Sequence, residues 1–137
     1  MRSVLAAGAL VAALVLAAPA AAATTTRTYH ASLASGSVSG TVTVTITGSS
    51  GTLSESLRGL PARSMSVVWL RSGSCSTTGF LVVRQRWTAS SSGRVSITVP
   101  LTTSMVQWFT YDWSHRGGVH AHLTDGSISV CAALHAG

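Results

Sequence analysis

The sequence predicts an all-β fold, an antiparallel Greek-key β-sandwich of about seven to eight strands. Three observations favour this fold class. Apolar and polar residues alternate along most of the chain, short turn-like segments interrupt the alternation, and no stretch after the N-terminal segment carries an apolar stripe of helical period. Short alternating strands at near-regular spacing are typical of sandwiches.

The alternation is clearest at residues 40–48, where Val42, Val44 and Ile46 share one face and threonines occupy the other. This pattern indicates a half-buried strand with a polar outer face. Seven other expected strands span residues 52–60, 64–71, 80–89, 94–101, 105–113, 119–125 and 127–134, and residues 28–35 are one further candidate. Glycine and serine at 48–51 and 90–93, and Asp-Gly at 125–126, are expected to form turns between strands.

The N-terminal segment is expected to be a secretory signal and not part of the fold. Residues 1–23 contain one basic residue near the start, then a short apolar run, then Pro19 and an alanine-rich end. The apolar run is shorter than the roughly 20 residues that a membrane span needs. We therefore expect a signal peptide at 1–23 and a single secreted domain at 24–137 that does not enter the membrane after the signal is removed, and that is a monomer.

Charge narrows the possible partners. After residue 23 the chain has eight arginines, no lysine and three acids, and the arginines are scattered instead of forming a basic run. Nucleic acid is therefore not an expected partner. A scattered positive charge on an exported domain favours weak association with an anionic cell-wall polymer or polysaccharide.

The two cysteines are expected to pair. Cys75 and Cys131 are the only cysteines, and an even number in an exported chain favours a disulfide. Such a bond closes a loop of more than fifty residues, for which the chain-entropy treatment gives about 4 kcal/mol of stabilisation.

Two segments resemble a known group of proteins. Residues 59–79, which read GLPARSMSVVWLRSGSCSTTG, and residues 118–133, which read GVHAHLTDGSISVCAA, resemble small exported β-sandwiches related to copper/zinc superoxide dismutases and chordin (CHRD) domains. In that group a strand after Gly-Leu-Pro ends in His-x-His. Here Trp69 and Arg71 stand at the two histidine positions, and neither side chain can ligate a metal. The resemblance thus implies a metal-site fold whose copper-binding pair is replaced, and we expect Arg71 to pair with Asp112 or Asp125.

Other residues leave a metal-binding alternative open. His120 and His122 form a His-x-His of their own, with His115 a few residues earlier. If the three imidazoles converge, they suit copper or zinc in a redox-type protein.

A third alternative is a carbohydrate-binding module. Trp108, Tyr111 and Trp113 lie in an aromatic segment that offers an exposed strip for stacking on sugars. Arg84 and Arg86 share a strand face and are expected to lie on a solvated or cation–π surface beside a tryptophan. The chain has no Gly-x-Ser-x-Gly nucleophile elbow and few carboxylates, so no catalytic or cofactor-binding residues are assigned. We expect a non-enzymatic binding or structural module.

Overall fold

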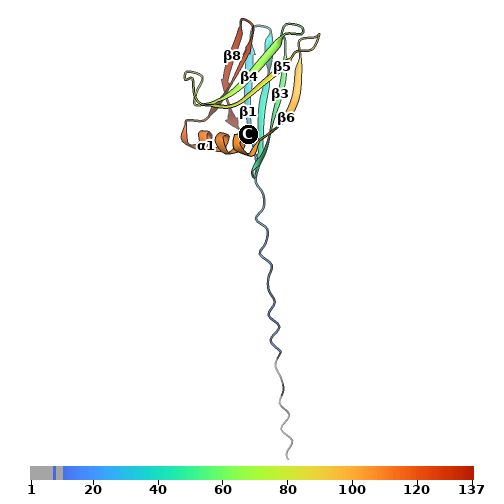
Figure 1. Ribbon diagram of the computed structural model, residues 1–137, viewed down its shortest axis with the longest axis vertical. Helices are drawn as coiled ribbons and strands as arrows, with labels where there is room; N and C mark the ends of the chain where they lie inside the picture. The colour runs from blue at the N-terminus through green and yellow to red at the C-terminus, as the bar shows by residue number, and fades with distance from the viewer. Residues whose placement is uncertain (1–7, 9–10) are drawn as a thin grey trace, which may run out of the picture.

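The computed structural model describes Gly8 and residues 11–137, and it contains a β-sandwich with one helix at its end (Figure 1). The prediction of an all-β, two-layered antiparallel fold is confirmed. The first sheet has the order β6-β3-β2-β1-β9 and the second β5-β4-β7-β8. The strands are β1 (Thr26–Ser35), β2 (Val38–Thr47), β3 (Ser50–Arg58), β4 (Met65–Ser72), β5 (Leu81–Thr88), β6 (Val95–Leu101), β7 (Val119–Asp125), β8 (Ile128–Ala133) and β9 (His135–Ala136).

The connections between the sheets make the fold a Greek key. Strands β1, β2 and β3 follow one another in the first sheet, after which the chain crosses to β4 and β5 and returns to place β6 beside β3. The chain then crosses from β6 to the second sheet again and places β7 beside β4, although β5, β6 and a helix separate them in the sequence. Residues far apart in the chain therefore meet on the outer face of the second sheet.

The core lies between the two sheets and follows the alternation in the sequence. Val42, Val44 and Ile46 point inward from β2, and Val68 and Leu70 point inward from β4. The alternate residues of β2 are threonines that face outward. Burying one apolar side chain of this size contributes about 1.5–3 kcal/mol, so these alternating positions fix which face of each strand points inward.

One predicted strand is wrong. Residues 105–113 do not form a strand but lie within the helix α1 (Thr103–His115), which crosses one end of the sandwich (Figure 1). Its N-cap is Thr102, whose Oγ1 accepts a hydrogen bond from the backbone N–H of Met105 at 3.2 Å. Aromatic residues favour strands locally, but here packing of one helical face against the core outweighs that preference.

The buried face of α1 is aromatic. Phe109 is fully buried and Trp113, four residues later, stacks parallel to it with 6.1 Å between ring centroids. Tyr29 of β1 contacts both rings, with centroids 4.9 Å from Phe109 and 4.5 Å from Trp113. Residues spaced by four share a face of a helix, whereas in a strand Tyr111 would join them. The helix thus separates Tyr111 from the other two aromatic rings.

The segment before β1 runs away from the sandwich as an extended tail (Figure 1). Residues 11–25 contain neither helix nor strand. The predicted signal peptide at 1–23 falls partly on residues 1–7, 9 and 10, which lie outside the described residues. In the part of the chain that the structure describes, no helix has the length and apolar character needed to cross a membrane.

Candidate functional site

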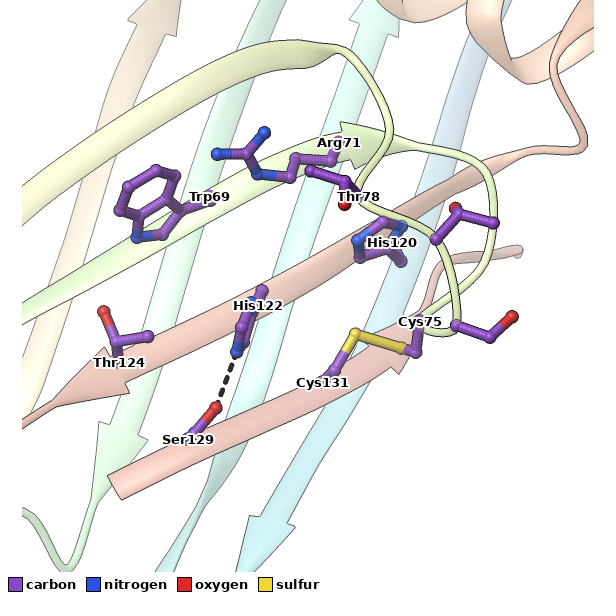
Figure 2. Close-up of a pocket in the computed structure, with 11 residues that line it drawn as sticks. Trp69, Arg71, Cys75, Thr78, His120, His122, Thr124, Ser129 and Cys131 are labelled. Atoms are coloured by element: carbon purple, nitrogen blue, oxygen red, sulfur yellow. Dashed lines mark hydrogen bonds between the residues drawn. A yellow bond between two sulfur atoms is a disulfide. The ribbon is translucent and has the colours of Figure 1, made fainter. Parts of the chain in front are cut away.

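A depression lies on the outer face of the second sheet. Its volume is about 680 Å³, and we call it the outer recess. It is formed by outward-facing residues of β4, β7 and β8 and by the loop that connects β4 to β5 (Figure 2). The lining residues are Trp69, Arg71, Cys75, Ser76, Thr77, Thr78, His120, His122, Thr124, Ser129 and Cys131.

Strand pairing places the predicted site residues opposite each other. In the β4–β7 ladder Trp69 is the partner of His122, and Arg71 is the partner of His120. Directly opposed residues of an antiparallel pair project from the same face of the sheet. Trp69 and Arg71 therefore adjoin the two histidines of β7.

Two arginines surround the Trp69 ring. The guanidinium carbon of Arg71 lies 4.8 Å from the ring centroid and that of Arg84 lies 5.2 Å from it. These distances allow cation–π attraction, which holds both side chains near the indole. The expected cation–π surface on β5 therefore exists for Arg84, but it forms with Trp69 of the neighbouring strand. No local sequence pattern predicts this contact, because it depends on the pairing of Trp69 with Arg84 across β4 and β5.

Arg71 does not pair with an acid, so that expectation is wrong. Its Nη1 donates to the carbonyl of Gly79 at 3.4 Å. Asp112 instead lies 3.0 Å from Nη1 of Arg116, and Asp125 accepts a hydrogen bond from the Ser64 hydroxyl. The other N–H groups of Arg71 have no acceptor among the described side chains and backbone, so the guanidinium can bind an external anion.

The two histidines of β7 are held by different hydrogen bonds. Nδ1 of His120 lies 2.9 Å from the carbonyl oxygen of Gly73. Because a carbonyl oxygen only accepts, Nδ1 carries the proton and donates it. Nε2 of His122 lies 2.7 Å from the Ser129 hydroxyl (Figure 2). Both rings are thereby oriented toward polar partners on the outer face.

The predicted triad of His115, His120 and His122 is not assembled. His115 lies at the end of α1, where its Nδ1 donates to the backbone carbonyl of Tyr111 at 3.0 Å. Within the described residues, no group of three or more His, Cys, Asp or Glu side chains is arranged to hold a metal ion. The remaining pair, His120 and His122, faces the indole of Trp69 and the cation of Arg71 across the ladder.

The predicted disulfide is confirmed. Cys75 and Cys131 are bonded, and the bond ties the loop after β4 to strand β8. Both cysteines line the outer recess, and the loop forms one of its walls (Figure 2). The disulfide therefore shapes the candidate site as well as closing a loop of the chain.

The three predicted aromatic residues divide between two environments. Trp108 and Tyr111 are exposed, while Trp113 packs against the core with Phe109 and Tyr29. Trp108 and Tyr111 lie edge to face with 6.4 Å between their centroids. Helical spacing explains the division, and the strand interpretation could not have predicted it.

Glu55 is an inward-facing acid that the site predictions do not include. It lies on the core face of β3 between Leu53 and Leu57, and only 2% of its surface is exposed. Neither carboxylate oxygen has a hydrogen-bond partner among the described residues. Burial raises the pKa of Glu55 to about 7. The period-2 pattern Leu53, Glu55, Leu57 is the sequence signal that places this acid in the core.

Comparisons of the chain with protein-family models, with curated proteins and with solved structures find no match.

Proposed function

We propose that this chain is exported and acts as a non-enzymatic binding module for an anionic polymer, such as an anionic polysaccharide or cell-wall polymer, with the outer recess as its main site. The disulfide supports export, because disulfides persist in oxidising compartments. The apolar, alanine-ending N-terminal segment supports it from the sequence.

The distribution of charge carries this proposal. All three acidic side chains of the chain lie in the described part, and all three are buried: Glu55, Asp112 and Asp125. The arginines after the N-terminal segment are exposed or half-buried. The side-chain charges that reach solvent in the described part are therefore positive, and among the described residues Arg116 is the only arginine with an acidic side chain within ion-pair distance. Such a surface attracts polyanions over distances comparable to the Debye length, about 8 Å at physiological ionic strength.

The outer recess is where that charge is best organised to bind. Arg71 and Arg84 flank one indole, and hydroxyl and imidazole groups line the adjoining floor and wall. Guanidinium groups bind carboxylate, sulfate and phosphate through charge-assisted hydrogen bonds. No acidic side chain lines the recess. The chemistry of this set of side chains favours an anion over a cation.

The family resemblance fits the same proposal. If the chain descends from a metal-site β-sandwich, then replacement of the histidine pair by Trp69 and Arg71 changed a cation site into an anion site at the same position. The pairing of these two residues with His122 and His120 supports that history.

Binding of polygalacturonate, a polymer of carboxylated sugars, tests the proposal. We expect the wild-type protein to bind it, with affinity falling as NaCl is raised. The double variant Arg71→Gln/Arg84→Gln should lose about tenfold or more in affinity, because charge-assisted hydrogen bonds are stronger than neutral ones.

A matched control separates the site from general charge. Arg58 and Arg94 also line one groove, on the outer face of the first sheet, and that groove contains neither tryptophan nor histidine. Arg58→Gln/Arg94→Gln removes the same charge and should change the affinity by less than about threefold. Equal losses in the two double variants would contradict a site in the outer recess, and no binding by the wild-type protein would contradict the proposed function.

A further inference from the structure

A second surface feature lies next to the outer recess. Three aromatic side chains are unusually exposed: Trp108 at 56%, Tyr111 at 47% and Phe80 at 64%. Trp108 and Tyr111 come from α1, and Phe80 immediately precedes β5. Large apolar groups that gather on a surface mark interaction sites more often than single exposed ones do. We call Trp108, Tyr111 and Phe80 the aromatic strip.

Arg116 joins the members of this strip. Its guanidinium carbon lies 4.0 Å from the centroid of Phe80 and 5.2 Å from that of Tyr111. Its Nη1 also lies 3.0 Å from the buried carboxylate of Asp112. That ion pair, with one partner almost completely buried, fixes the position of the arginine between the rings. Phe80 and Tyr111, the two rings of the strip that Arg116 contacts, are therefore held in place although they are exposed.

The loop from Gly73 to Phe80 links the strip to the outer recess. Thr77 and Thr78 of this loop line the recess, while Phe80 at its end belongs to the strip. The backbone N–H of Gly73 donates to the carbonyl of Gly118 at 2.8 Å, which places the loop beside the segment that leaves α1 (Figure 1).

A chain of contacts runs directly from one feature to the other. Arg71 in the recess donates to the carbonyl of Gly79, the residue before Phe80. Phe80 lies under Arg116, and Arg116 contacts Tyr111. The cationic recess and the aromatic strip thus lie on two sides of one loop.

We propose that the recess and the aromatic strip form one continuous surface for an acidic polysaccharide, with sugar rings stacked on the strip and carboxylate or sulfate groups bound by Arg71 and Arg84. This inference rests on the proposed function and names the class of its polymer. The contacts that connect the two features through the loop from Gly73 to Phe80 and the positive charge beside exposed rings are the observations behind it.

Each half of the surface fits a different part of such a ligand. A sugar ring has an apolar C–H face, which packs on an aromatic ring, and hydroxyl groups at its rim, which need polar neighbours. The strip offers exposed rings next to Arg116 and to the threonines of the loop. A polyphosphate also carries the negative charge that the arginines of the recess can bind, but it has no sugar ring to stack on the aromatic strip. Two linked contacts on one polymer also raise the overall affinity above that of either contact alone.

The test compares two probes on one pair of surface variants. Trp108→Ala/Tyr111→Ala should weaken binding to polygalacturonate by about tenfold, as expected for loss of aromatic anchors. The same variant should bind inorganic polyphosphate of similar total charge within about twofold of wild type, because that probe contacts only the arginines. Arg71→Gln/Arg84→Gln should weaken binding to both probes.

Met65→Ala is the control for loss of an exposed apolar side chain, since Met65 is 52% exposed and lies outside both features. It should leave both affinities unchanged. Equal effects of Trp108→Ala/Tyr111→Ala on the two probes, or no effect on polygalacturonate, would overturn the extended surface while leaving the arginine site standing. Failure of the wild-type protein to bind polygalacturonate would instead overturn the proposed function itself.

Discussion

Glu55 of β3 lies directly opposite Val42 of β2, and both side chains point into the core. On the other side of β3, its partner in the sheet is Ile97 of β6. An ionisable group between apolar neighbours, with no hydrogen bond to its oxygens, is stable only while it is neutral. The fold therefore contains a group whose ionisation opposes folding.

The stability of the protein should fall as pH rises from about 4.5 to about 7. The pKa of Glu55 is raised from 4.5 to about 7 in the folded state, so between these values the folded chain holds a proton that the unfolded chain has released. Because the unfolded state binds fewer protons, the free energy of unfolding decreases with pH across this range. The size of the shift corresponds to about 3 kcal/mol. Urea unfolding followed at several pH values between 4 and 8 measures the effect.

The variant Glu55→Gln isolates this contribution, since an amide of the same shape does not ionise. Its free energy of unfolding should equal that of the wild type near pH 4.5. Above pH 7 it should exceed that of the wild type by most of the roughly 3 kcal/mol that the pKa shift represents. If the difference between the two proteins does not change with pH, then Glu55 does not ionise within the core as described.

Substitutions in α1 distinguish its two faces. Phe109→Ala should lower the free energy of unfolding by about 3–5 kcal/mol, because it leaves a cavity beside Tyr29 and Trp113. Tyr111→Ala, on the exposed face, should change it by less than about 1 kcal/mol. Chemical denaturation of both variants gives the comparison. Similar losses from the two would indicate that residues 109 and 111 share a face, as they would in a strand.

The start of α1 provides an independent check on the helix. Thr102→Ala removes the hydroxyl that caps the N–H of Met105 and should cost about 1 kcal/mol. Thr102→Ser keeps an oxygen in the same place and should retain most of the stability. Thermal melts of the two variants would show the contrast as a difference of a few degrees in Tm. Equal Tm values for the two would argue against a cap at this residue.

Local sequence patterns predicted the layers of this fold well. The alternation of Val42, Val44 and Ile46 with threonines predicted both a strand and its buried face, because strand side chains alternate strictly. The disulfide between Cys75 and Cys131 was predicted from the number of cysteines and from the oxidising compartment expected for an exported chain. The first prediction needs only a few neighbouring residues, and the second needs only the number of cysteines.

The helix and the detailed site could not be predicted in the same way. Residues 105–113 carry aromatic side chains that suit either a strand or a helix, and the contact of Phe109 with Tyr29, eighty residues earlier in the sequence, favours the helix. Arg71 was expected to pair with an acid. Arg116, the C-cap of α1, lies four residues after Asp112 and is therefore the nearer partner of that acid. The meeting of Trp69 with Arg84 and of Arg71 with His120 depends on strand register, which is fixed only when the whole sheet forms.

The disulfide should affect binding as well as stability. Its cysteines are 56 residues apart, and removing the bond with Cys75→Ala/Cys131→Ala should lower the free energy of unfolding by about 4 kcal/mol. The bond also anchors the loop that forms a wall of the outer recess, beside exposed Ser76, Thr77 and Thr78. Without it, the loop is held by hydrogen bonds that include those from Gly73 to Gly118, from His120 to Gly73 and from Arg71 to Gly79.

We therefore expect the double alanine variant to bind polygalacturonate at least about fivefold more weakly at a temperature where circular dichroism shows it to be folded, because ordering the released loop now opposes binding. Binding of polyphosphate to the same variant should weaken in parallel, since both probes use Arg71. Thr102→Ala, which destabilises the fold at a distance from the loop, is the matched control and should bind both probes as wild type does. If the cysteine variant remains folded and binds with unchanged affinity, then the loop does not form a wall of the site.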